Sequence, residues 1–116
     1  MKAKGRVLAV IFIVLLAGAN HAVASDHKKT CKHLGKMYMA AASLRDKGAD
    51  RDTVFSQLRI MGDQLTGYFI DDEQVFNIAE QVYYSAEFAE QEGDAFARAI
   101  ERQCINGQIV DVFVRR

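Results

Sequence analysis

The segment CKHLGKMYMAAASLRDKG, residues 31–48, has the clearest hydrophobic periodicity in the chain. Its apolar side chains recur at three- and four-residue spacing, which is typical of a helix that buries one face. They are Leu34, Met37, Tyr38, Ala41 and Leu44. Thr30 can cap the start of such a helix, and Gly48 can end it after Lys47. We therefore expect an amphipathic helix from about Thr30 to Lys47.

Three further helices are expected after this one. The second starts at DRD, where Asp50 or Asp52 can cap it, and the third starts at DDEQ, where Asp71 and Gln74 have the spacing of a capping box. The fourth starts after a glycine, with Asp94 as its cap. The chain has no proline, which favours helices over turns. The predicted fold is all-α, a small four-helix array. The apolar stripes of the last three helices contain Val54, Leu58, Met61 and Leu65; Val75, Ile78, Ala79 and Val82; and Phe96, Ala97, Ile100 and Cys104.

The character of the sequence changes after Cys104. An Asn-Gly pair there is a favourable helix stop, and the QIVDVFV that follows is rich in residues typical of β-strands. The mature chain shows no second strand-like segment to pair with it. We therefore expect a C-terminal extended tail from about residue 107, with Ile109, Val112 and Phe113 lying on the bundle. Pairing of this tail with a second copy, which would give a homodimer, or with a partner is the alternative.

The first residues are typical of a secretory signal peptide. MKAKGR supplies three basic residues, Val7 to Ala19 is an apolar run of 13 residues, and AVA at residues 22–24 offers small residues to a signal peptidase. The apolar run is shorter than the roughly 20 residues that span a bilayer. We expect residues 1–24 to be removed, which leaves residues 25–116 as a single helical domain without a membrane span. The predicted location is the periplasm or the outside of the cell.

The charge balance argues against a nucleic-acid partner. The whole chain has 15 basic and 15 acidic residues, and the signal peptide removes three basic residues and no acid, which leaves 12 and 15, a net charge of −3. A protein that binds nucleic acid usually carries an excess of basic residues. The charges are also segregated, because residues 26–47 hold six basic residues and residues 71–94 hold eight acidic and no basic ones. This pattern indicates two oppositely charged solvated surfaces.

Cys31 lies between two histidines in SDHKKTCKH, residues 25–33. One hypothesis is therefore a metal-handling protein that uses His27, Cys31 and His33, since zinc and copper accept such donors. The spacing is not a recognised ligand pattern, however, and on a helix two residues that are two apart point to different sides. His27 is expected to lie in a flexible leader. A reactive thiol is also disfavoured, because free thiols of exported proteins are usually oxidised.

The cysteine count favours a disulfide instead. Cys31 and Cys104 are the only cysteines and both lie in the exported part, one in the first helix and one in the last. The bond would close a loop of 73 residues and stabilise the fold by roughly 4 kcal/mol in the chain-entropy model. We predict this disulfide, with no metal site and no cofactor.

No catalytic residue is assigned. The sequence has no nucleophile motif, no glycine-rich phosphate loop and no histidine after His33, so we expect that the protein is not an enzyme. Asp71, Asp72 and Glu73 are explained by the start of a helix, where the dipole favours negative charge. The pair Tyr83 and Tyr84, like the cluster of Met37, Tyr38 and Met39, has the spacing of core and rim residues.

The order of motifs resembles that of small secreted bacterial and phage proteins of uncharacterised function. CKHLGKMYMAAASLRDKG is followed by DRDTVFSQL, VFNIAEQVYY and a closing RQC. The shared features are a cysteine that opens a helix, an arginine before a glycine turn, an aliphatic-to-tyrosine helix and a last cysteine. The resemblance covers about Cys31 to Cys104 and implies no active site. YYSAEFAE replaces a proline-containing turn of these proteins, so the sequence does not define where the third helix ends.

These observations predict an exported, non-enzymatic binding module. We consider three forms of such a module, namely an inhibitor, a chaperone-like protein and an envelope interaction protein. In each form the partner is an unknown protein or envelope component. The metal-handling protein with His27, Cys31 and His33 is the alternative.

Overall fold

The computed structural model describes residues 26–116, so the predicted signal peptide lies outside the described part. Helices cover residues 26–46, Arg51–Asp63 (α2), Asp72–Tyr84 (α3) and Gly93–Ile105 (α4), with a single 3₁₀ turn at Ala86–Phe88 (η1). Two short strands, Tyr68–Phe69 (β1) and Val114–Arg115 (β2), complete the described part. The predicted all-α class, with four helices closed by one disulfide, is confirmed.

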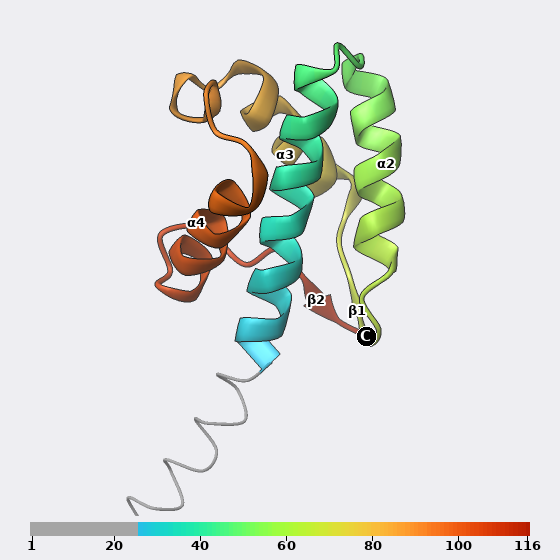
Figure 1. Ribbon diagram of the computed structural model, residues 1–116. Coiled ribbons are helices and arrows are strands. Elements are labelled where there is room, and N and C mark those ends of the chain that lie inside the picture. The colour runs from blue at the N-terminus through green and yellow to red at the C-terminus, as the bar shows by residue number, and fades with distance from the viewer. Residues whose placement is uncertain (1–25) are drawn as a thin grey trace, which may run out of the picture.

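The helix of residues 26–46 lies in the middle of the molecule, with α2 on one side and α4 on the other (Figure 1). Its predicted stripe is the centre of the core, where Leu34, Met37, Tyr38 and Ala41 are buried. The helix passes α4 closely at Gly35, since a Cβ at this position would lie 2.3 Å from the carbonyl oxygen of Ala97. Only a residue without a side chain allows this approach. The other buried core residues include Val54, Leu58, Val75, Ile78, Ala79, Val82, Phe88, Phe96 and Ile100.

The predicted helix caps were only partly correct. The Asp50 side chain accepts a hydrogen bond of 2.7 Å from the Thr53 backbone N–H and caps α2. Asp71 occupies the corresponding position of α3 but makes no side-chain capping bond, because the Gln74 N–H donates instead to the Asp71 backbone oxygen. The fourth helix begins at Gly93, so Asp94 lies within its first turn and is not its cap.

The first helix also begins earlier than predicted. Residues 26–30 are already helical, so Thr30 is not the N-cap and His27 does not belong to a flexible leader. Thr30 is 2% exposed, and its hydroxyl donates to the backbone oxygen of His27. The helix extends because this first turn packs against other parts of the chain, which the local sequence does not show.

The chain after α4 pairs within the molecule, which corrects the expectation that no second strand-like segment exists. β1 and β2 are antiparallel, with Tyr68 opposite Arg115 and Phe69 opposite Val114. A turn at Gly67, where φ is +85°, brings Tyr68 into the extended conformation after α2. Phe113 is buried against the bundle, and Ile109 and Val112 are partly buried there.

Arg45 joins the first helix to the segment between α3 and α4. Its guanidinium donates to the backbone oxygens of Val82 and Phe88 at 3.0 and 2.9 Å and to that of Gln91 at 3.0 Å. Three carbonyls at the end of α3 and in the following turn are thereby fixed by one side chain. In residues 26–116, no helix has the length and apolar character needed to cross a membrane.

Candidate functional site

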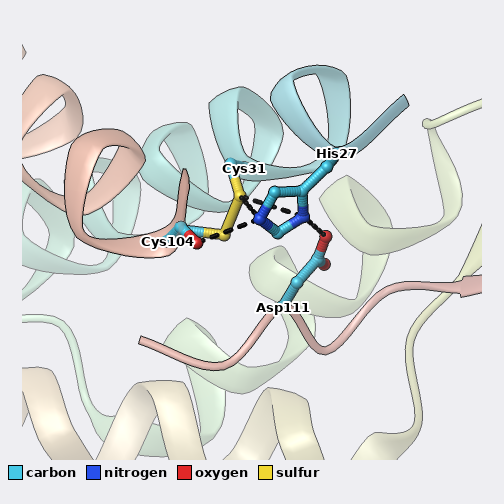
Figure 2. A group of neighbouring side chains, drawn as sticks. All are labelled: His27, Cys31, Cys104 and Asp111. Carbon is cyan, nitrogen blue, oxygen red and sulfur yellow. Dashed lines mark hydrogen bonds and ion pairs between the residues drawn. A yellow bond between two sulfur atoms is a disulfide. The ribbon is translucent and has the colours of Figure 1, made fainter. Parts of the chain in front are cut away.

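Cys31 and Cys104 form a disulfide that joins the first helix to the end of α4 (Figure 2). Their Cα atoms are 5.4 Å apart, and both side chains are fully buried. The predicted pairing is therefore present. In this oxidised form neither sulfur is a thiolate, and a thiolate is the form of cysteine that binds a metal ion.

His27 lies one helical turn before Cys31 and faces the disulfide (Figure 2). Its Nδ1 is 3.0 Å from the Oδ2 atom of Asp111, and its Nε2 is 3.1 Å from the backbone oxygen of Cys104. Both neighbours are hydrogen-bond acceptors. A doubly protonated ring donates to both of them, whereas a neutral ring donates to only one.

Asp111 holds the chain after α4 against the start of the first helix. Its Oδ2 also accepts a hydrogen bond from the Thr30 hydroxyl, and its Oδ1 accepts one of 3.1 Å from the Phe113 backbone N–H. Sequence reasoning missed this residue as part of a site. The one signal that it gave was an acidic side chain between the valines of IVDVFV, where a strand-like segment is otherwise apolar.

His33, the third residue of the metal hypothesis, lies elsewhere. Its Nε2 donates to the backbone oxygen of Met61 at 2.6 Å, and its ring meets that of Phe113 edge-on with centroids 5.6 Å apart. The structure thus does not bring His27, Cys31 and His33 together. It brings together another set, His27, Cys31, Cys104 and Asp111, whose potential ligand atoms all lie within 4.8 Å of one another.

A cleft of about 790 Å³ opens beside this cluster. Its base consists of buried or nearly buried side chains, namely Leu34, Tyr38, Ile78 and Phe88. One side is α3, and the other is the chain that follows α4, with Ile109, Val110 and Val112. The volume is in the range of sites that enclose a small ligand or a segment of a larger one.

The rim of the cleft is rich in carboxamides. Gln74, Asn77 and Gln81 come from α3, Gln103 from α4 and Gln108 from the segment after it. Each carboxamide offers both a hydrogen-bond donor and an acceptor. The charged residue in the lining is Glu87, so the cleft does not have the basic character that phosphate groups or nucleic acids require.

Tyr38 is fixed at the base of this cleft. Its hydroxyl donates to the Oε1 atom of Gln81 at 2.7 Å, and its ring packs edge-on against Phe88 and Phe96. Burial, with a smaller contribution from the negative charge of Glu87, raises the pKa of Tyr38 to about 12. The side chain is therefore a neutral donor at physiological pH, and it orients the carboxamide of Gln81.

The segment that forms the second side of the cleft has unused backbone groups. The N–H groups of Val110 and Val112 form no hydrogen bond with any part of residues 26–116, and Val110 is 75% exposed. This segment continues directly into β2. Main-chain groups beside a strand are the groups that pair with an added extended chain.

The acidic residues of the segment 71–94 do not gather in the cleft. Asp72 pairs with Arg59 at 3.4 Å, and Glu80 pairs with Arg51, so two of them contact basic residues of α2. Tyr84 is 68% exposed and Tyr83 is half-buried with its hydroxyl bonded to the backbone oxygen of Ala49, which agrees with a position at the rim of the core.

Comparison of the chain with family models, curated proteins and solved structures gave no match.

Proposed function

We propose that the protein is an exported, non-enzymatic binding module that takes an extended segment of a protein partner into the cleft between α3 and the chain after α4. The observation that carries this proposal is the combination of a carboxamide rim with an apolar base in one cleft of about 790 Å³. A peptide presents the same combination, because its backbone is neutral and polar while its side chains alternate between two faces.

The unused N–H groups of Val110 and Val112 support a peptide over another neutral ligand. An extended peptide placed beside them can pair with the segment that continues into β2, and main-chain hydrogen bonds then supply much of the affinity. Carboxamides such as those of Asn77 and Gln103 on the rim can bond to the outer edge of the bound peptide.

A phage-displayed library of random linear peptides tests this proposal. Peptides are selected on the exported protein and then measured against two variants, Asn77→Trp, which fills the cleft, and Gln57→Trp, an exposed control on α2 outside it. We expect binding to the wild type and the control, and a loss of at least about tenfold, or 1.4 kcal/mol, in Asn77→Trp. Amide hydrogen exchange at Val110 and Val112 should slow when a selected peptide is bound.

Two results would count against the proposal. One is a set of peptides that bind Asn77→Trp and the wild type equally. The other is the absence of peptide binding together with cleft-dependent binding of N-acetylglucosamine oligomers, which would make a glycan the ligand of the carboxamide rim.

A further inference from the structure

We propose that reduction of the Cys31–Cys104 disulfide converts the cluster around it into a four-ligand zinc site, with His27, Cys31, Cys104 and Asp111 as ligands. Two thiolates, one imidazole and one carboxylate are donors that zinc accepts in tetrahedral sites. This set shares His27 and Cys31 with the hypothesis from the sequence but replaces His33. The inference is independent of the proposed peptide cleft.

The spacing of the ligand atoms is already close to that of such a site. Zinc–ligand bonds of about 2.0–2.1 Å to nitrogen and oxygen and about 2.3 Å to sulfur place neighbouring ligand atoms about 3.3–3.8 Å apart in a tetrahedron. In the cluster, Nδ1 of His27 is 3.0 Å from Oδ2 of Asp111, both ring nitrogens are 3.7 Å from Sγ of Cys31, and all the potential ligand atoms lie within 4.8 Å of one another. The two sulfurs are bonded to each other, and reduction frees their side chains to rotate apart.

The groups behind these ligands are also arranged as in zinc sites. A histidine ligand usually donates its other N–H to a carbonyl or carboxylate, which fixes the ring. Nε2 of His27 lies 3.1 Å from the backbone oxygen of Cys104, which leaves Nδ1 for the ion. Asp111 is held in the same way, because its Oδ1 accepts the Phe113 N–H and its Oδ2 faces the cluster. These bonds hold the ring of His27 and the carboxylate of Asp111 toward the sulfurs.

Burial gives the site a dry interior with an entrance. Both cysteines are fully buried, while the side chains of Asp111 and His27 are 18% and 35% exposed. An ion can therefore enter beside His27 and reach the sulfurs behind it. The zinc charge of +2 is offset by two thiolates and one carboxylate, which leaves a net charge of −1 for the occupied site.

The two forms of the cluster exclude each other. A dithiol reductant transfers two electrons and two protons to the Cys31–Cys104 bond, which yields two thiols while the reductant becomes a disulfide. Binding of Zn²⁺ then displaces the two thiol protons. A disulfide oxidant that removes two electrons from the thiolates restores the bond and releases Zn²⁺. The cluster is thus predicted to hold zinc in reducing surroundings and to give it up on oxidation.

The test uses the purified exported protein, reduced with a phosphine under anaerobic conditions and titrated with Zn²⁺ against a chromophoric chelator. We expect one equivalent to bind to the reduced protein and none to the oxidised protein. Co²⁺ as a spectroscopic substitute should show tetrahedral d–d bands and thiolate charge-transfer bands. The variants His27→Gln and Asp111→Asn should weaken binding by more than about tenfold. His33→Gln is the matched control and should bind as the wild type does.

Three outcomes would overturn the inference. Reduced and oxidised protein that bind Zn²⁺ equally would place the ion elsewhere. A Co²⁺ spectrum without thiolate bands would exclude the cysteines. An effect of His33→Gln as large as that of His27→Gln would return the site to the residues suggested by the sequence. Circular dichroism of each reduced variant without metal establishes whether its helices are retained. If His27→Gln unfolds, the zinc affinity of Asp111→Asn, which preserves the side-chain shape, is the measurement that tests the inference.

Discussion

Removal of the disulfide is expected to remove a large share of the free energy of unfolding of the protein. The bond joins residues that are 73 positions apart, and it encloses 74 of the 91 described residues. Constraining a loop of that length lowers the entropy of the unfolded chain by about 15 cal/mol/K, which corresponds to about 4 kcal/mol at 25 °C. Small domains have a total free energy of unfolding of about 5–15 kcal/mol. The double variant Cys31→Ala/Cys104→Ala should therefore be folded but marginal.

Urea denaturation followed by circular dichroism measures this loss. With a slope of about 1 kcal/mol per molar urea for a chain of this size, the midpoint should fall by about 3–4 M. The wild-type protein reduced in the presence of a chelator should match the double variant, because both lack the cross-link and any metal ion. A loss below about 1 kcal/mol in both would refute the reasoning, and would mean that the two ends of the loop are already held together in the unfolded state.

Three further changes test the packing of the first helix. Gly35→Ala should destabilise the protein by about 2–4 kcal/mol in urea denaturation, since its Cβ would lie 2.3 Å from the Ala97 oxygen; a neutral effect would mean that α4 moves away freely. Arg45→Lys should lower the free energy of unfolding by about 2–3 kcal/mol, because a lysine cannot bond to three carbonyls at once. Faster amide exchange in the segment after α3 would show that the loss of these hydrogen bonds is the cause. The pKa of Tyr38 is near 10 in the unfolded chain and about 12 in the folded protein. The contribution of this side chain to the free energy of unfolding is therefore complete below pH 10, and it falls by about 2–3 kcal/mol as the pH rises through 12. Tyr38→Phe should flatten this fall in pH-dependent denaturation, and an unchanged slope would contradict the burial of the hydroxyl.

The helices could be predicted because each depends on a repeated local pattern. Leu34, Met37, Tyr38 and Ala41 all lie on one face whatever the rest of the chain does, and they are all buried. The disulfide was predictable for a different reason, since two cysteines in a chain that is expected to be exported leave one intramolecular pairing. The predicted capping box of α3 does not form although its sequence is favourable. The backbone oxygen of Asp71, and not its side chain, accepts the hydrogen bond from the Gln74 N–H.

The cluster and the cleft could not be predicted, because both depend on contacts between distant residues. Asp111 is 84 positions from His27 in sequence, and no local pattern connects them. The early start of the first helix has the same origin, since its first turn is held by Asp111 and by the Cys104 carbonyl. Tyr68 and Phe69 escaped notice as a strand because two residues are too few for an alternating pattern to be seen.

The cluster and the cleft share one segment of the chain. Asp111, the proposed zinc ligand, lies between Val110 and Val112, which line the proposed peptide cleft. The Asp111 carboxylate is bonded to His27 and to the Phe113 N–H, so it connects the cluster to the backbone of this segment. If a zinc ion bound at the cluster changes the affinity for a peptide, linkage requires that the bound peptide change the zinc affinity by the same factor. The segment from Val110 to Phe113 is therefore where the two proposed activities meet, although neither depends on the other.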